Sequence, residues 1–161
     1  MSWQAKRYHD ISCGHRVVGH EGKCRHLHGH NYRVHFTCEA DELDNVGRVI
    51  DFSDMKSKLC MWLEENWDHK MLLWEHDPVA NVLTDDKIKT GDGTTLDDGI
   101  VLVPFNPTAE NIAQHLVLVV GPQQLKGTGI KLTYCEVEET RKCSAVYALQ
   151  PQKNGSRQME R

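Results

Sequence analysis

The sequence lacks any apolar run that approaches about 18 residues, the length that a membrane-spanning helix needs. Its first ten residues, MSWQAKRYHD, also lack the apolar core of a secretion signal. We therefore expect a cytoplasmic protein that has no membrane partner. The sequence has no stripe of basic residues, and its formal net charge is −4, so we expect no nucleic acid partner. A small anionic substrate is compatible with this charge, because local rather than net charge governs a pocket.

The sequence also lacks CxxC pairs, although it contains six cysteines, and it shows no framework of a small disulfide-linked scaffold. In a reducing compartment these cysteines are expected to be free thiols. The chain has 161 residues, of which 39% are apolar and 26% are charged, values typical of a globular protein with an ordinary core. We expect one domain over residues 1–150 and a flexible polar tail over residues 151–161.

Hydrophobic periodicity predicts the order of the elements. Apolar and polar residues alternate over residues 9–15 and 28–40, which indicates two strands. Residues 48–52 are interpreted as a third short strand, in a hairpin with the second. Apolar residues then recur at helical spacing, so a helix is expected to begin at the N-cap Ser53 and to end near Asn66.

A second helix and two more strands are predicted in the second half of the chain. The helix is expected to begin at the N-cap Thr108 and to stop at the Gly-Pro pair 121–122. Strands are expected over residues 129–140 and 143–149. Strands and helices are thus segregated along the chain, which indicates an α+β fold with an antiparallel sheet and the two helices packed on one face.

The stretch CRHLHGHNY, residues 24–32, contains three histidines and one cysteine. His28 and His30 are two positions apart on a predicted strand, so both imidazoles project from the same side. His15 is the best candidate for a third ligand, because it ends the preceding strand and can lie opposite the pair if the two strands are antiparallel neighbours. Three histidines with an open fourth position are typical of a catalytic zinc site rather than a closed structural one.

Cys24 is not expected to be a fourth ligand, because the sequence has no second cysteine nearby and no zinc-finger spacing. We interpret Cys24 as a thiol close to the metal, where its thiolate can act as a base or a nucleophile. The role of His26 stays open. The other histidines are expected to be ordinary surface or core side chains, namely His9, His20, His35, His76 and His115.

Asp68 and His69 are an acid–base candidate just after the first helix. In a turn the carboxylate can orient the imidazole and raise its basicity, although Asp–His neighbours are common. Further candidates are three glutamates near the end of a predicted strand, namely Glu136, Glu138 and Glu139. A carboxylate that faces a pocket can accept two parallel hydrogen bonds from a heterocycle with adjacent N–H groups. The residues alone do not separate the three glutamates.

Five segments, spread from residue 13 to residue 147, together resemble one family. They read CGHRVVGHEGKCRHLHGHNYRV, GRVIDFSDMK, WDHKMLL, PTAENIA and EETRKCSAVY. The sequence is similar to the 6-pyruvoyltetrahydropterin synthase and 6-carboxytetrahydropterin synthase family. Its Cys-x-x-x-His-x-His spacing resembles the bacterial 6-carboxy branch, which serves queuosine biosynthesis, because the pyruvoyl branch usually has its cysteine further from the HGH element.

The resemblance implies a role for the residues of the first motif. His15, His28 and His30 correspond to the family's zinc ligands, and Cys24 corresponds to its catalytic cysteine. Zinc is therefore the cofactor that we expect, and the resemblance implies no external redox cofactor.

The later motifs acquire roles in the same way. Asp68 and His69 correspond to the family's acid–base pair. Glu139 corresponds to the glutamate that holds the pterin ring and joins the proton transfer, so the resemblance selects it among the three glutamates. Thr108, in the PTAENIA segment, is a further candidate for substrate binding.

The implied substrate is 7,8-dihydroneopterin triphosphate, and the implied reaction is that of a zinc-dependent lyase. Triphosphate leaves by elimination, and the 6-carboxy branch also releases acetaldehyde, whereas the pyruvoyl branch keeps the side chain. The implied architecture is the tunnelling fold, assembled into a trimer-based homo-oligomeric ring, with a hexamer as the expected form and sites at subunit interfaces. The loop over residues 84–99 is longer than in the most compact members.

Two readings from other classes compete with the pterin enzyme. In one, the histidines bind zinc only to stabilise the fold, and replacing Cys24 or His69 is harmless. In the other, the protein is a zinc hydrolase, but no HExxH-type helix supplies the acidic base that such an enzyme needs.

Overall fold

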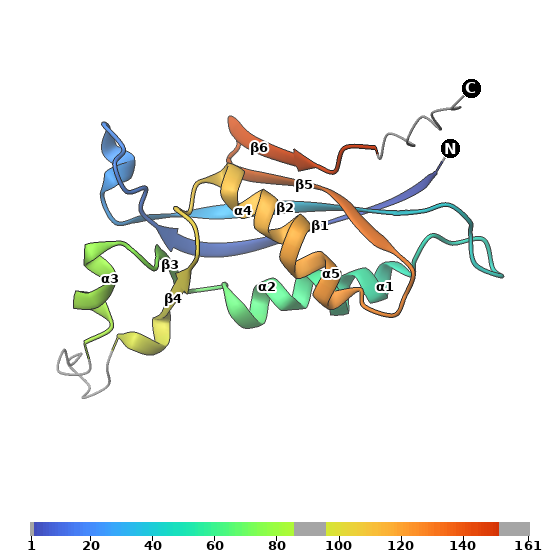
Figure 1. Cartoon of the computed structure of the whole chain (residues 1–161), viewed down its shortest axis with the longest axis horizontal. Helices are drawn as coiled ribbons and strands as arrows, with labels where there is room; N and C mark the ends of the chain where they lie inside the picture. The colour runs from blue at the N-terminus through green and yellow to red at the C-terminus, as the bar shows by residue number, and fades with distance from the viewer. Residues whose placement is uncertain (1, 86–95, 152–161) are drawn as a thin grey trace, which may run out of the picture.

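One six-stranded sheet organises the computed structural model, which describes residues 2–85 and 96–151. The spatial order of the strands is β4-β3-β1-β2-β5-β6 (Figure 1). Their bounds are Trp3–His15 for β1, His28–Ala40 for β2, Met71–Trp74 for β3, Ile100–Val103 for β4, Lys131–Thr140 for β5 and Cys143–Ala148 for β6. Most of the predicted tail, residues 152–161, lies outside the described residues, and so do residues 86–95 of the predicted loop.

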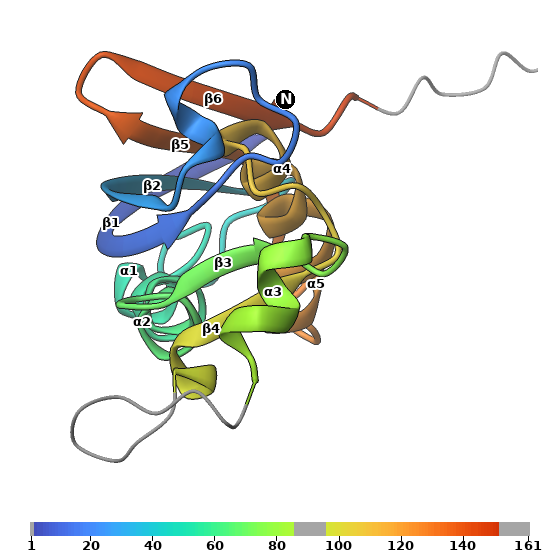
Figure 2. The same cartoon turned by 90° about the vertical axis from the view of Figure 1, so that its left-hand side faces the viewer.

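The strands β1, β2, β5 and β6 form the predicted antiparallel sheet. Two short strands extend it in parallel, because β3 pairs with β1, and β4 pairs with β3. Figure 2 shows the sheet curling toward these two strands. Their four-residue apolar runs, MLLW and IVLV, are too short to show a period, so the predicted order of elements does not include them. The sheet is therefore mixed rather than purely antiparallel.

Two long helices pack on one face of the sheet, as predicted (Figure 1). The first consists of α1 (Phe52–Met55), a π-helical stretch (Lys56–Cys60) and α2 (Met61–Asn66). The second consists of α4 (Ala109–His115), a π-helical stretch (Leu116–Val120) and α5 (Gly121–Gln124). The short helices are α3 (Pro78–Leu83) and two 3₁₀ helices, η1 (Lys23–Arg25) and η3 (Asp97–Gly99). Within the described part of the chain, no helix is long and apolar enough to span a membrane.

The predicted strand over residues 48–52 is wrong, because residues 48–51 form an irregular connection and Phe52 is already the first residue of α1. Arg48 donates to Asp44 at 2.9 Å and to Asp51 at 2.7 Å, which closes the turn. Asp51, rather than Ser53, is the N-cap of α1, and its side chain accepts a hydrogen bond from the Ser53 amide at 2.8 Å. Capping and charge-assisted hydrogen bonds thus override the β-propensity of the apolar residues here.

The second helix begins at Thr108, as predicted, but it does not stop at the Gly-Pro pair. It continues to Gln124 through Gly121 and Pro122. A Cβ atom at Gly121 would lie 2.8 Å from the Cβ atom of Leu132 on β5, so this glycine permits close contact between helix and sheet. Pro122 follows the π-helical stretch and lies in the first turn of α5, where its missing N–H is tolerated.

Alternation along the strands separates a covered face of the sheet from a polar one. Ile11, Val34 and Phe36 are at most 5% exposed and pack under the helices. Each such side chain contributes roughly 1.5–3 kcal/mol of hydrophobic stabilisation. On the opposite face, Arg33 and Asp10 form an exposed ion pair. The functional groups described next lie at the end of the covered face, where β1 stops and β2 begins.

Candidate metal centre and active site

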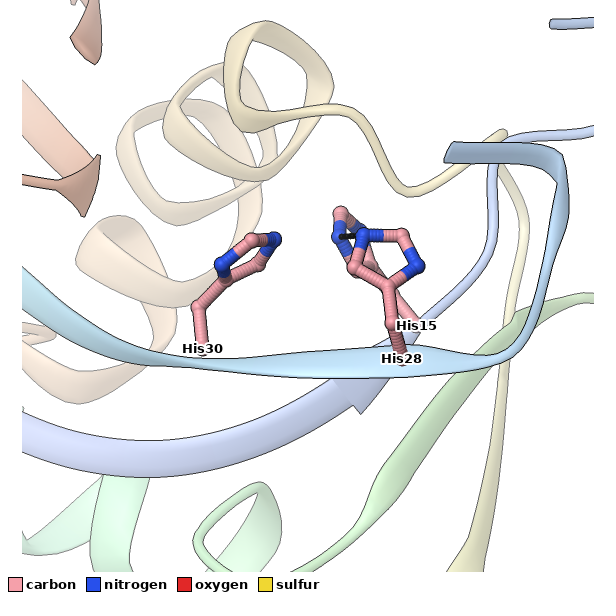
Figure 3. A group of neighbouring side chains, drawn as sticks. All are labelled: His15, His28 and His30. Carbon is pink, nitrogen blue, oxygen red and sulfur yellow. Dashed lines mark hydrogen bonds between the residues drawn. The ribbon is translucent and has the colours of Figure 1, made fainter. Parts of the chain in front are cut away.

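The three predicted ligands come together at the end of the sheet. The strands β1 and β2 are antiparallel neighbours, and the Cα atoms of His15 and His28 are direct partners. His30 projects from the same side of β2 as His28 (Figure 3). One ring nitrogen from each side chain lies within 4.8 Å of the others. We call these three residues the triad. The antiparallel pairing that was expected to bring His15 opposite His28 and His30 is therefore confirmed.

Hydrogen bonds determine which nitrogen atoms of the triad carry lone pairs. His15 Nδ1 lies 2.7 Å from the Pro107 carbonyl oxygen, and His28 Nδ1 lies 2.7 Å from the His26 carbonyl oxygen. A carbonyl only accepts, so each Nδ1 carries the proton and each Nε2 carries a lone pair. The two Nε2 atoms lie 3.0 Å apart and repel each other unless a proton or a cation lies between them. Two nitrogens on one tetrahedral zinc are about 3.3 Å apart, so the residues fit this ion.

His30 contributes a buried nitrogen that lacks a hydrogen-bond partner among the described residues. A Glu139 oxygen lies 3.2 Å from this Nε2 atom, but without the geometry of a hydrogen bond. An unpaired buried nitrogen is costly, and a bound cation removes that cost. Burial lowers the pKa of His30 and of His15, so both imidazoles are neutral at neutral pH, as metal ligands must be.

Tyr32 packs against the triad. Its ring makes edge contacts with His15 and His30, with centroid separations of 5.7 and 5.5 Å. Its hydroxyl is buried and has no hydrogen-bond partner in the described part of the chain. Burial raises the pKa of Tyr32, and Glu139 and Cys24 are among the neighbouring groups that raise it further. Tyr32 is two residues after His30 on β2, so it shares the ligand side of the strand.

Among the three candidate glutamates, Glu139 faces the triad. Its carboxylate oxygens lie 3.2 and 4.0 Å from two nitrogens of the triad. Glu138 instead pairs with His35 on the polar face of the sheet, and Glu136 accepts a hydrogen bond from Ser144 at 2.8 Å. Successive side chains of a strand point to opposite faces, so Glu139 faces the triad while Glu136 and Glu138 lie on the polar side.

Thr108 caps α4, and its hydroxyl oxygen accepts a hydrogen bond from the Asn111 amide at 3.2 Å. The residue before it, Pro107, supplies the carbonyl that orients His15. The turn that begins α4 therefore also fixes one ring of the triad. A capping hydroxyl keeps its own proton to donate, and the binding of substrate by Thr108 stays a prediction.

Asp68 and His69 are paired, with His69 Nδ1 2.6 Å from Asp68 Oδ2. The main chain fixes this turn to β1, because the His69 amide donates to the Ser12 carbonyl at 2.7 Å and the Ser12 amide donates to Asp68 Oδ1 at 2.9 Å. His69 has a φ of 57°, in the left-handed region. Desolvation raises the pKa of Asp68, but hydrogen bonds from Ser12 and His69 outweigh it and lower the pKa below its ordinary value.

The His69 side chain of this pair is 81% exposed. It borders an open hollow of about 630 Å³, whose lining also includes Ser12, Asn31 and His30 of the triad. Within residues 2–85 and 96–151, no hydrogen bond or ion pair joins His69 to the triad or to Cys24. Within the described part of one chain, the candidate site therefore consists of two parts that no hydrogen bond or ion pair connects.

Three polar residues that the sequence did not single out hold the segment that carries Cys24. Arg16 pairs with Asp77, and Asn106 exchanges two hydrogen bonds with the backbone of Val18. Asp77 precedes a proline, a pattern that marks a helix start, and it caps α3. This signal could have located the helix, but nothing in the spacing reveals partners so far apart in sequence.

A family model described as 6-pyruvoyl tetrahydropterin synthase matches residues 4–150. A 6-carboxy-5,6,7,8-tetrahydropterin synthase of Rickettsia bellii is 34% identical over 134 residues, which cover 83% of this chain and 91% of the relative. A protein of the same name from Haemophilus influenzae is 30% identical over 138 residues, covering 78% of this chain and 91% of the relative.

Solved structures agree with these matches. An uncharacterized protein of Wolinella succinogenes superposes with a TM-score of 0.77 at 25% identity, covering 93% of this chain and 99% of that one. A 6-pyruvoyl tetrahydropterin synthase of Plasmodium vivax superposes with a TM-score of 0.68 at 19% identity, covering 91% and 97% of the two chains, and shows the same fold. The chain belongs to the 6-pyruvoyl tetrahydropterin synthase family.

Proposed function

We propose that the protein is a zinc-dependent tetrahydropterin synthase of the 6-carboxy type, with a place in queuosine biosynthesis. The reaction converts 7,8-dihydroneopterin triphosphate and water to 6-carboxy-5,6,7,8-tetrahydropterin, acetaldehyde and triphosphate. The observation that carries this proposal is the histidine triad, whose three ring nitrogens lie within 4.8 Å of one another, with a Glu139 carboxylate oxygen 3.2 Å from His30 Nε2. The names of the bacterial relatives and the short spacing between Cys24 and His28 support the 6-carboxy branch.

In this proposal the triad holds the metal through one ring nitrogen of each residue. When bound there, zinc supplies Lewis acidity toward the oxygen atoms of the substrate side chain. Cys24, as a thiolate, accepts a proton from the carbon next to those oxygens. Glu139 accepts two N–H groups of the pterin ring, and the hydroxyl of Thr108 contributes a further hydrogen bond. This anchoring holds the side chain in line with Cys24.

We also propose that the Asp68–His69 pair acts in the site of a neighbouring copy of the chain. A proton donor has to come within about 3 Å of the reacting atom, or act through one water. Among the described residues, His69 makes no hydrogen bond or ion pair with the triad of its own chain, yet its side chain is 81% exposed and its partner Asp68 orients the ring. A homo-oligomeric ring brings the two parts together, with the pair from one copy facing Cys24 of the next.

The experiment that tests the reaction is an incubation of the zinc-loaded protein with 7,8-dihydroneopterin triphosphate, with products identified by mass spectrometry. Cys24→Ala is run alongside, and Cys143→Ala serves as the matched control, because Cys143 is an exposed thiol on β6. We expect the 6-carboxy product and acetaldehyde from the parent and the control, and neither from Cys24→Ala. A 6-pyruvoyl product would keep the family chemistry and change the branch. A zinc-bound protein without turnover would favour a structural zinc-binding module.

Mixing two inactive variants tests the shared site. Cys24→Ala and His69→Ala are each expected to be inactive alone, but together, after dissociation and reassembly, they should regain part of the activity. Mixed rings then contain some sites with both Cys24 and His69. No recovery in mixed rings would contradict a site that two copies complete. A fully active monomer in sedimentation would contradict it as well.

A further inference from the structure

We propose that Arg16, together with Asp77, is a positioning residue that holds Cys24 at the metal centre. The inference rests on the proposed function, because it concerns the segment that carries the proposed catalytic thiol. That segment, residues 16–27, connects the last residue of β1, a ligand, to the first residue of β2, also a ligand. We call it the Cys24 segment. It contains one short 3₁₀ helix and has few buried apolar residues of its own.

Arg16 joins the two ends of the Cys24 segment to a distant part of the chain. Its Nε atom donates to Asp77 Oδ2 at 2.5 Å, and its Nη2 atom donates to Asp77 Oδ1 at 2.7 Å. Its remaining Nη1 atom donates to the carbonyl oxygen of Arg25 at 2.9 Å. The Val17 amide donates to the carbonyl of Cys24 at 2.8 Å. The carbonyls of Cys24 and Arg25 are therefore held by the neighbouring residues Val17 and Arg16.

Asp77 provides a rigid support for this arrangement. Its side chain is completely buried, and its Oδ1 atom also accepts a hydrogen bond from the Val79 amide at 2.9 Å, which caps α3. Hydrogen bonds from Arg16 are the main cause that keeps the pKa of Asp77 below its ordinary value, so the carboxylate is charged. Leaving the buried Asp77 carboxylate without its partner is strongly unfavourable, so the Arg16 guanidinium is held in a single place.

A second connection relates the Cys24 segment to the triad. Asn106 accepts a hydrogen bond from the Val18 amide and donates to the Val18 carbonyl, both at 2.9 Å. The next residue, Pro107, accepts the hydrogen bond that orients His15. The position of the thiol relative to the metal ligands is therefore set by two separate attachments, through Asp77 and through Asn106.

The chain contains a matched pair for comparison. Arg33 makes the same two-point contact with Asp10, at 2.8 and 3.0 Å, but this pair is exposed on the polar face of the sheet. Lysine keeps the charge of arginine and loses its fork of donors, so it cannot hold two carboxylate oxygens and a carbonyl at once. Arg16→Lys therefore removes the positioning contacts of the Cys24 segment. Arg33→Lys removes the same two-point contact from an exposed pair that does not touch this segment.

The test measures the alkylation of Cys24 by iodoacetamide, read from its peptide by mass spectrometry, in Arg16→Lys, Asp77→Asn and Arg33→Lys. Asparagine at position 77 keeps the acceptor that caps α3 and removes the charge that binds Arg16. Loosening the half-buried segment should raise the alkylation rate about fivefold or more in the first two variants, with no change in Arg33→Lys. Their kcat should fall about tenfold to a hundredfold at nearly unchanged KM, because a thiol misplaced by about 1 Å reacts poorly.

Zinc content separates positioning from general destabilisation. We expect the same zinc stoichiometry as in the parent protein, because no ligand is changed. Unchanged alkylation and kcat in both variants would overturn the proposal, and so would a loss of zinc and of folded protein in step with the loss of rate. If the parent protein itself does not turn over the pterin, the proposed function fails, while the alkylation rates still decide whether Arg16 and Asp77 position Cys24.

Discussion

Zinc binding should stabilise the folded protein by an amount that can be calculated. In the metal-free chain the lone pairs of His15 and His28 face each other at 3.0 Å, and a buried nitrogen of His30 has no hydrogen-bond partner among the described residues. The unfolded chain has no such group of ligands, so zinc binds the folded state preferentially. At a free zinc concentration of 100 times Kd, the free energy of unfolding rises by about 2.7 kcal/mol. For a domain of this size that corresponds to a rise in Tm of about 8 °C.

The assay is a thermal melt of the chelator-treated protein over a series of free zinc concentrations. The Tm should rise with the logarithm of free zinc above Kd, by about 4 °C per tenfold increase. His28→Gln should abolish this dependence. His35→Gln is the matched control, because His35 lies on the same strand and faces the opposite side, where it pairs with Glu138.

The reasoning would be refuted by a zinc-dependent rise in Tm that is the same in His28→Gln and in the parent. Zinc would then bind elsewhere on the chain, and the short contact between the imidazoles would be satisfied by a shared proton. If the Tm of the parent protein does not change with zinc concentration, the triad does not bind the ion.

Three further predictions concern the helices. Thr108→Ala should cost about 1 kcal/mol of stability in chemical denaturation, because α4 loses its N-cap, whereas Thr108→Ser should keep most of it. Gly121→Ala should destabilise the protein by about 1–3 kcal/mol despite the higher helix propensity of alanine, since its Cβ atom would lie 2.8 Å from Leu132, and an unchanged denaturation midpoint would contradict this. Burial lowers the pKa of His115 in the folded protein. The stability that the neutral ring contributes is therefore present above the unfolded pKa near 6.5 and is lost as pH falls through the lower folded value. Between pH 7.5 and pH 5, metal-free His115→Leu should lose less stability than the metal-free parent.

Local patterns predicted the elements that depend on local chemistry. The triad was predictable because a strand repeats every two residues, so His28 and His30 had to share a side. The N-cap Thr108 was predictable because its hydroxyl satisfies an amide within the same turn. The helix that ends at Asn66 was predictable from its apolar spacing.

The features that the sequence did not predict depend on partners far away in the chain. The strands β3 and β4 exist because they pair with each other and with β1, not because their four residues show a period. Gly121 looked like a helix stop, but its role is set by Leu132 on β5. Spacing along the sequence likewise could not reveal two features of the tertiary structure. Arg16 contacts Asp77, and His69 pairs with Asp68 rather than with the triad in the described part of the chain.

The way in which the sheet positions the triad limits the radius of the metal ion that the triad can bind. His15 and His28 are directly paired on neighbouring strands, and a Cβ atom at Gly29 would already lie 3.1 Å from the carbonyl of Cys13. Ladder hydrogen bonds keep these strands about 4.8 Å apart, so the distance between the two ligands can change little. To obtain longer bonds, a large cation such as cadmium would have to spread the paired backbone or rotate the rings of His15 and His28 away from the carbonyls that hold them. The triad should therefore favour small divalent ions, and the selecting element is the spacing of a β-ladder rather than the choice of ligand atoms.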